Sequence, residues 1–196
     1  MPRSKEHKAR SCEAILAAAY RLFTTRGFER VTIDAVMADA GLTRGAFYNH
    51  FASKADLYRE AFQYGADQQA LGRAVVEGAP EAGELEEIVR HYLSPAHADS
   101  ESGGCPLSFL NADAAVDRWE IRQLYSGAFE KVSAVLGEAM PQGAPARENA
   151  GAVMALMIGA VTVSRALTDP QRKRMLLQSC EQLALQLVAA PAAAES

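Results

Sequence analysis

The stretch from residue 27 to residue 54 constrains the fold more than any other part of the chain. It reads GFERVTIDAVMADAGLTRGAFYNHFASK and contains two short segments with apolar residues at helical spacing, separated by Gly41. Thr32 and Thr43 each stand where a hydroxyl can cap the N-terminus of a helix. Gly41 stands where a chain leaving a helix often adopts a left-handed conformation. Two short helices joined by a glycine turn are typical of a helix-turn-helix unit.

The second of these helices has one apolar side and one polar side. Phe47 and Phe51 are four residues apart, so they share one face of the helix and belong to the core. Arg44, Tyr48 and Asn49 lie largely off that face. The polar side is therefore available to a groove of DNA.

Two sequence elements around this unit, G-F-x-x-V-T-I and F-Y-x-H-F-x-S-K-x-x-L, carry a family resemblance. Residues 15–62 closely resemble, without a gap, the DNA-binding domain of the tetracycline-repressor (TetR) family. The resemblance implies an all-helical homodimeric regulator that binds palindromic operator DNA and is released by a small molecule. It assigns base contacts to Thr43, Arg44 and Gly45, and phosphate contacts to Thr32, Tyr48, His50 and Lys54, with Asn49 reaching a base or a phosphate.

These side chains differ in what they are expected to contribute. Arg44 is the main candidate for base recognition, because its guanidinium matches O6 and N7 of guanine, whereas Lys54 should position the protein without reading the sequence. His50 has a structural alternative, since it shares the face of Phe47 and can be buried. Asp34 departs from the family pattern: a carboxylate suits the start of a helix but repels phosphate, so Asp34 is not counted as a DNA contact.

Charge divides the chain in the same way. Residues 1–60 contain ten Lys and Arg against seven Asp and Glu, a balance of +3, and the remainder carries −7, which together make the net −4. An acidic protein with a basic N-terminal third is not a nonspecific coat for nucleic acid, and it suggests one docking surface. Arg3, Lys5, Lys8 and Arg10 form either an arm near the phosphates or a frayed helix start.

The remainder of the chain keeps a helical pattern, and we expect an all-α protein of about nine helices. The expected domains are a three-helix DNA-binding domain at residues 1–54, an effector-binding and dimerisation domain at 55–190 and a disordered tail at 191–196. Beyond the first domain, helices are predicted at 55–73, 84–93, 105–116, 117–140, 147–167 and 170–190, with a loop at 94–104 and a break at 141–146.

The last two long helices are the predicted dimer interface. Gly151, Ala155 and Gly159 recur every four residues and leave a smooth stripe on which another helix can lie closely. The final helix presents a broad apolar face that includes Leu176, Leu183 and Leu187. Two such helices from each chain would make a four-helix bundle about a twofold axis. The alternative is a role in the core of a single chain.

An effector pocket is expected among the helices that begin near residues 85, 106, 117 and 147. By default its ligand would be apolar or aromatic, although each lining candidate can equally be ordinary core. The candidates are Cys105, Phe109, Trp119, Tyr125, Phe129, Met154 and Met157.

Cys105 has a further possible role. It precedes Pro106, which can occupy the first position of a helix, and a helix N-terminus favours a reactive thiolate. The segments GCPLSFLNAD and GAVTVSRALTDP resemble a TetR subgroup with a G-C-P/L motif, in which some members sense electrophiles or oxidants. The alternative is a small capping residue without a redox role.

Other functional classes find little support in the sequence. No nucleophile–base pair, phosphate-binding glycine loop or metal-ligand spacing is evident, so we expect neither enzymatic activity nor a cofactor or metal. The charged N-terminus and the apolar run at 150–164, about 15 residues long, predict a cytoplasmic protein without a signal or a membrane span. A DNA-binding architectural protein that has no ligand is the second hypothesis, and broad, salt-sensitive DNA binding would distinguish it.

Overall fold

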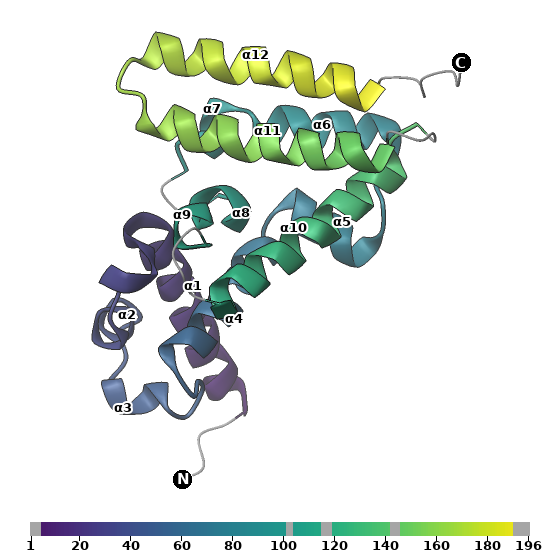
Figure 1. Ribbon diagram of the computed structural model, residues 1–196. Coiled ribbons are helices and arrows are strands. Elements are labelled where there is room, and N and C mark those ends of the chain that lie inside the picture. The colour runs from purple at the N-terminus through teal and green to yellow at the C-terminus, as the bar shows by residue number, and fades with distance from the viewer. Residues whose placement is uncertain (1–4, 101–103, 115–118, 142–145, 190–196) are drawn as a thin grey trace. The chain divides into compact units, whose positions relative to one another are not determined.

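The computed structural model describes residues 5–100, 104–114, 119–141 and 146–189. Within these ranges all regular secondary structure is helical and there is no strand, which confirms the predicted fold class (Figure 1). The helices are α1 (Lys5–Arg30), α2 (Ile33–Asp39), α3 (Arg44–Phe47), α4 (Lys54–Asp67), α5 (Ala70–Glu77), α6 (Ala82–Tyr92), α7 (Pro95–Ala98), α8 (Pro106–Phe109), α9 (Asn111–Ala114), α10 (Trp119–Ala139), α11 (Ala146–Ala166) and α12 (Pro170–Ala189).

The described residues contain more helices than the sequence predicted, because three predicted segments were wrong. The helix expected at 55–73 stops after α4 and restarts as α5, at a polar stretch that has no apolar side chain to bury. The helix expected at 105–116 breaks at Leu110 into α8 and α9. The loop expected after residue 93 contains α7, which Ser94 caps by accepting a hydrogen bond from the backbone N–H of His97 at 3.2 Å.

The chain forms two compact units, Met1–Gln68 with Glu101–Leu124, and Gln69–Ser100 with Tyr125–Ser196. The domain boundary expected after residue 54 lies inside the first unit, since α4 packs along α1. The segment that carries α8 and α9 also belongs to this unit.

Aromatic side chains between α1 and α4 build the core of the first unit. The ring of Tyr58 lies edge-on to Phe23 and Phe28, with centroids 4.9 Å and 5.2 Å apart. Gly65 faces the ring of Tyr20 so closely that a Cβ atom would collide with it. Burying each of these rings contributes about 1.5–3 kcal/mol to the stability of the fold. The packing of the aromatic rings therefore holds α4 against α1.

Capping residues and a glycine turn define the ends of the short helices, largely as the sequence indicated. Thr32 and Ser53 cap α2 and α4, each accepting a hydrogen bond from a backbone N–H in the first turn, and Gly41 has a φ of +68°. The cap at Thr32 and the left-handed conformation of Gly41 were predicted and are confirmed. Thr43 occupies the N-cap position of α3 but makes no capping hydrogen bond, so that part of the prediction was wrong.

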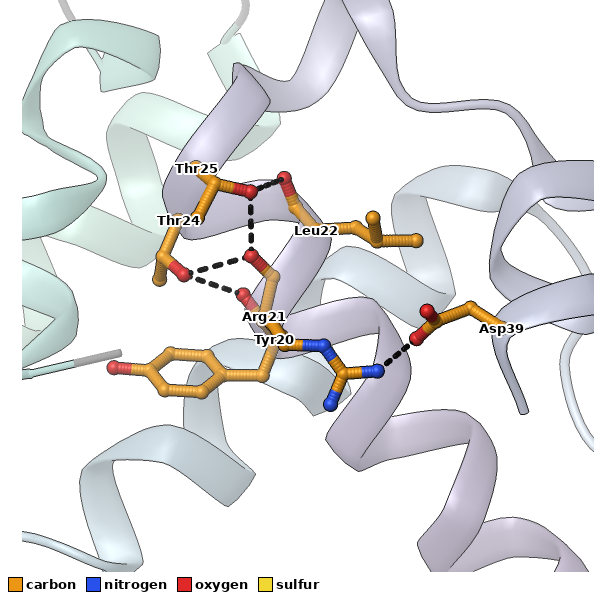
Figure 2. Close-up of polar contacts among 6 residues, drawn as sticks. All are labelled: Tyr20, Arg21, Leu22, Thr24, Thr25 and Asp39. Carbon is orange, nitrogen blue, oxygen red and sulfur yellow. Dashed lines mark hydrogen bonds and ion pairs between the residues drawn. The ribbon is translucent and has the colours of Figure 1, made fainter. Parts of the chain in front are cut away.

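One polar contact of α1 reaches the helix-turn-helix unit, and others stay within α1 (Figure 2). Arg21 forms an ion pair with Asp39 at the end of α2, which ties the two helices together. Thr24 and Thr25 donate their hydroxyl protons to backbone carbonyls one turn earlier, at 2.8 Å to Tyr20 and Arg21 respectively. Hydroxyl groups that bond back to their own helix in this way need no partner on another element.

The second unit is built around α11 and α12, which lie side by side and are joined by a short turn (Figure 1). Met154 and Met157 on α11 and Leu177 on α12 are fully buried. An ion pair between Arg90 of α6 and Glu181 of α12, at 3.3 Å, joins the surface of these helices.

The apolar part of α11 is longer than the sequence estimate. Of the described residues, Asn149–Ala166 is long and apolar enough to cross a membrane by length and composition, with a mean hydropathy of 1.3. However, 44% of this stretch is buried inside the protein, and the helix packs on α12. This is how a core helix of a folded domain behaves.

Candidate nucleic-acid interface

The core side of the helix-turn-helix unit is as expected. Phe47 is completely buried and Phe51 is 2% exposed, which confirms both as core residues. Helix α3 itself has only four residues, but hydrogen bonds from the backbone N–H groups of His50 and Phe51 to the carbonyl of Phe47, at 2.9 Å and 3.0 Å, continue the helical path. The second helix of the unit is thus a short helix followed by a tight turn.

The opposite side of α3 is exposed and polar. Thr43, Arg44, Gly45 and Asn49 are exposed, and the Tyr48 side chain is 61% exposed. The ring of Tyr48 lies edge-on to Phe47 at 5.1 Å, which fixes its aromatic part and leaves the hydroxyl in solvent. An exposed row of hydrogen-bond donors on a rigid aromatic base is what a DNA groove requires.

Arg44 is paired with the residue that the sequence analysis had set aside. The Nη1 atom of Arg44 lies 2.6 Å from the carboxylate of Asp34, and both side chains remain more than half exposed. Asp34 therefore faces Arg44. An exposed pair of this kind contributes little to stability, about 0–1 kcal/mol, but it limits the rotamers of the arginine.

Two of the expected phosphate contacts also have structural roles. Lys54 lies over the ring of Phe28 at 4.3 Å and donates to the carbonyl of Glu29 at 3.4 Å, so its position is restricted. The hydroxyl of Thr32 accepts the hydrogen bond from Ala35 at 3.1 Å, which leaves its own proton for a phosphate oxygen. Both side chains therefore contribute to the fold of this unit.

His50 is half-buried rather than enclosed in the core. Its ring lies beside Phe51 at 6.1 Å, and the residue lines a polar pocket with Asn49 and the start of α1. Lys5, Lys8 and the residues between them are helical, so the basic N-terminus is not an extended arm from Lys5 onward. Arg3 lies outside the described residues.

A carboxylate that the sequence analysis missed joins the α8–α9 segment to the end of α1 and to α4. Both carboxylate oxygens of Asp113 accept the backbone N–H of Phe28 at 3.0 Å, and one accepts the hydroxyl of Tyr58 at 3.0 Å. Burial and the neighbouring carboxylate raise the pKa of Tyr58, so its phenol stays protonated. At the other end of the segment, the hydroxyl of Tyr20 donates to the carbonyl of Gly104. Asp113 and Phe28 are 85 positions apart, and no local pattern signals their contact.

Cys105 lies in this same segment. It holds the N-cap position of α8, directly before Pro106, and is only 4% exposed. Its carbonyl accepts the hydroxyl proton of Ser108 at 3.0 Å. The thiol is therefore positioned as the sequence indicated, but it is shielded from bulk solvent.

The residues predicted to line an effector pocket fall into both compact units. Phe109 is largely buried beside Cys105 in the first unit, where Trp119 is 70% exposed and so is not enclosed. Met154 and Met157 are fully buried in the second unit, with Tyr125 and Phe129 half-buried. A pocket of about 270 Å³ between α4 and α10 contains none of these residues; its lining is Ala55, Asp56, Tyr58, Arg59, Glu120, Ile121 and Leu124.

The predicted dimer residues lie largely on exposed or half-exposed faces. Gly151 and Gly159 have no atom within 4 Å of the position a Cβ would take, and Ala155 is exposed. On α12, Leu183 is 48% exposed, while Leu176 and Leu187 are half-buried. These side chains leave an apolar surface on the second unit.

A buried aromatic base, a left-handed glycine turn and an exposed polar helix define a helix-turn-helix DNA-binding protein. Residues 15–61 match the model of the bacterial regulatory proteins of the tetR family. The match covers the DNA-binding part of the chain and supports a DNA-binding domain of the tetR type at these residues.

The similar proteins differ in how much of the chain they match. The HTH-type transcriptional repressor BepR of Brucella suis is 29% identical over 165 residues, which cover 84% of this chain and 70% of BepR. The uncharacterized HTH-type transcriptional regulator YfiR of Bacillus subtilis is 35% identical over 65 residues, about a third of each chain. The crystal structure of E. coli NemR in its reduced form has the same fold, with a TM-score of 0.71 over 93% of this chain and 99% of NemR, at 19% identity.

Proposed function

We propose that the protein is a ligand-responsive transcriptional repressor that binds palindromic operator DNA as a homodimer in the cytoplasm. The observation that carries this proposal is the arrangement around α3, where Arg44, Tyr48 and Asn49 are exposed over buried Phe47 and Phe51. In this arrangement Arg44 reads bases, together with Thr43 and Gly45. Thr32, Tyr48, His50 and Lys54 hold phosphates, and Asn49 can do either.

Dimerisation supplies the second DNA-binding unit. The surface formed by Gly151, Ala155 and Gly159 of α11 with Leu183 of α12 supports this proposal, because it is apolar and has no charged side chain between residues 149 and 164. Two helix-turn-helix units must meet successive major grooves about 34–36 Å apart. A shift of a few ångströms in their separation would release one half-site.

Release is assigned to a small apolar effector or to modification of Cys105, and the α8–α9 segment offers the route to the DNA-binding residues. Any change at Cys105 acts on the segment that Asp113 fastens to the N–H of Phe28 and to Tyr58. Phe28 directly precedes the helix-turn-helix unit, so displacement of Asp113 would alter the support of α2 and α4 together. The coupling would typically amount to about 1–3 kcal/mol.

The first experiment defines the operator and tests which residues read it. Selection from a random duplex library should give one inverted repeat, whose two halves reflect the twofold symmetry. Arg44→Ala should then cost about 1–3 kcal/mol on the selected site and relax the sequence preference. Lys54→Ala should weaken binding to all sequences alike. Enrichment of no sequence, with strongly salt-dependent binding to every duplex, would instead favour an architectural protein without a ligand.

The second experiment tests release through Cys105. Cys12 and Cys180 are replaced by serine so that only one thiol remains. The replacement is needed because Cys12 and Cys180 are half-buried, although burial raises the pKa of both thiols. Alkylation of Cys105 to one equivalent should release the operator, Cys105→Ser should not respond, and Asp113→Ala should bind DNA but respond less. Equal release by the Cys105→Ser protein would exclude modification of this thiol as the signal.

A further inference from the structure

A polar pocket lies between the start of α1 and the turn that follows α3. Its volume is about 270 Å³, and its lining consists of His7, Lys8 and Ser11 from α1, with Asn49 and His50 from the turn. The lining contains one permanent positive charge, two imidazoles and a carboxamide, and it contains no carboxylate. Such a group of donors is suited to an anion.

The pocket adjoins the surface assigned to DNA. Asn49 and His50 lie five and six residues after Arg44, on the path that continues α3, and the exposed Tyr48 precedes them directly. The backbone N–H groups of Asn49 and His50 are already used within the turn, at 3.2 Å to Ala46 and 2.9 Å to Phe47. An anion in the pocket would therefore be held by side chains, and a helix seated in a major groove has phosphates along both of its sides.

We propose that this pocket is the seat of one DNA backbone phosphate, and that Lys8 and His7 of α1 hold it together with Asn49 and His50. Ser11 donates its proton to the carbonyl of His7 at 2.9 Å, so it shapes the wall of the pocket. This phosphate site would make the start of α1 part of the DNA-binding surface. The inference rests on the proposed DNA-binding function and adds residues that the family resemblance did not assign.

The test measures how duplex affinity depends on salt for the full chain and two single variants. One variant is Lys8→Ala. Its matched control is Arg26→Ala, which removes one exposed positive charge from the same helix 18 residues further on, about 27 Å away at the helical rise. Both residues are exposed, and circular dichroism checks that both variants fold. The probe is a fluorescent 30-base-pair duplex containing the selected site, with a scrambled duplex beside it.

The logarithm of the association constant falls as the logarithm of the salt concentration rises. Loss of one phosphate contact should make this negative slope shallower by about 0.9, which corresponds to roughly eightfold weaker binding at 0.1 M salt. Lys8→Ala should show this change on both duplexes, with the ratio between them unaltered, and Arg26→Ala should match the wild type. Adding Asn49→Ala to Lys8→Ala should cost less than the sum of the two single effects, because both side chains hold the same phosphate.

Three other outcomes would contradict the proposed phosphate site, and each has a different meaning. If Lys8→Ala binds the selected duplex like the wild type while Arg44→Ala does not, the proposed phosphate site is wrong, but the proposed function as a DNA-binding regulator is retained. If inorganic phosphate at millimolar concentration shifts the NMR signals of His7 and His50 but the duplex does not, the pocket takes a free anion and not DNA. If the wild type binds no duplex, both the seat and the proposed function fail.

Discussion

The α2–α3 surface and the α11–α12 surface expose opposite kinds of side chain. Around α3 the apolar residues are buried and the exposed ones are Arg44, Tyr48 and Asn49. Along α11 and α12 the exposed residues include Val163, at 51%, and Leu183, at 48%. A surface that leaves donors in solvent suits phosphates and base edges, whereas a surface that leaves aliphatic groups in solvent suits another protein surface.

One glycine from each of the two units shows a related contrast. Gly65 in the first unit is covered by the ring of Tyr20 from its own chain, which occupies the space that a side chain at this position would need. Gly159 in the second unit has nothing within 4 Å of a Cβ position. Gly65 therefore serves packing within the chain, whereas Gly159 leaves open space beside α11.

The largest effect is expected from a charge on the apolar surface of α12. Leu183→Asp should weaken the dimer by about 2 kcal/mol or more, roughly 30-fold, because it buries an unpaired carboxylate in the interface. Analytical ultracentrifugation over a concentration series measures the change. Gln178→Asp is the control: it introduces the same residue in the same helix about 140° around the axis. A wild-type protein that sediments as a monomer at micromolar concentration would remove this surface as a dimer interface.

A methyl group at position 65 should destabilise the first unit. Gly65→Ala places a Cβ against the ring of Tyr20, and such overpacking typically costs about 1–3 kcal/mol. Gly127→Ala in α10 has open space around its Cβ and should instead stabilise the protein by about 0.5–1 kcal/mol. Urea unfolding of the two variants gives both values, and equal stabilities would contradict the tight contact with Tyr20.

Removing the carboxylate beside Arg44 should have a smaller effect, on sequence preference. Asp34→Asn releases the guanidinium from its 2.6 Å ion pair, and the lost restriction should change operator affinity by no more than about 1 kcal/mol. Because the variant also removes a negative charge, binding to nonspecific duplexes should become tighter. The ratio of specific to nonspecific affinity should therefore fall, and a ratio that stays constant would show that Asp34 does not orient Arg44.

The smallest effect concerns stability and pH in the second unit. Burial lowers the pKa of His97 from its ordinary 6.5, the hydrogen bond to the carbonyl of Tyr92 opposes this shift, and His91 and Arg165 add to it. Folding thus favours the neutral ring. Its contribution is fully present above about pH 6.5 and is lost as the pH falls from there through the lower folded pKa. Thermal unfolding between pH 7.5 and 5 should show a steeper loss for the wild type than for His97→Gln.

Much of the first unit could be predicted because the relevant signals are local. The caps at Thr32 and Ser53, the left-handed Gly41 and the buried pair Phe47 and Phe51 each depend on residues a few positions apart. One of the misplaced helix boundaries lies where a polar stretch interrupts a weak pattern, between α4 and α5.

The all-helical fold, the helix-turn-helix unit and the polar face of α3 could all be predicted from the sequence, since helical periodicity and capping are properties of short segments. Only the tertiary structure decided that Asp34 faces Arg44, that Lys8 shares a pocket with His50, and that Asp113 holds the N–H of Phe28. These pairs join elements 10 to 85 positions apart. Which distant side chains come into contact depends on how whole helices pack. Patterns within a short stretch of sequence do not predict this packing.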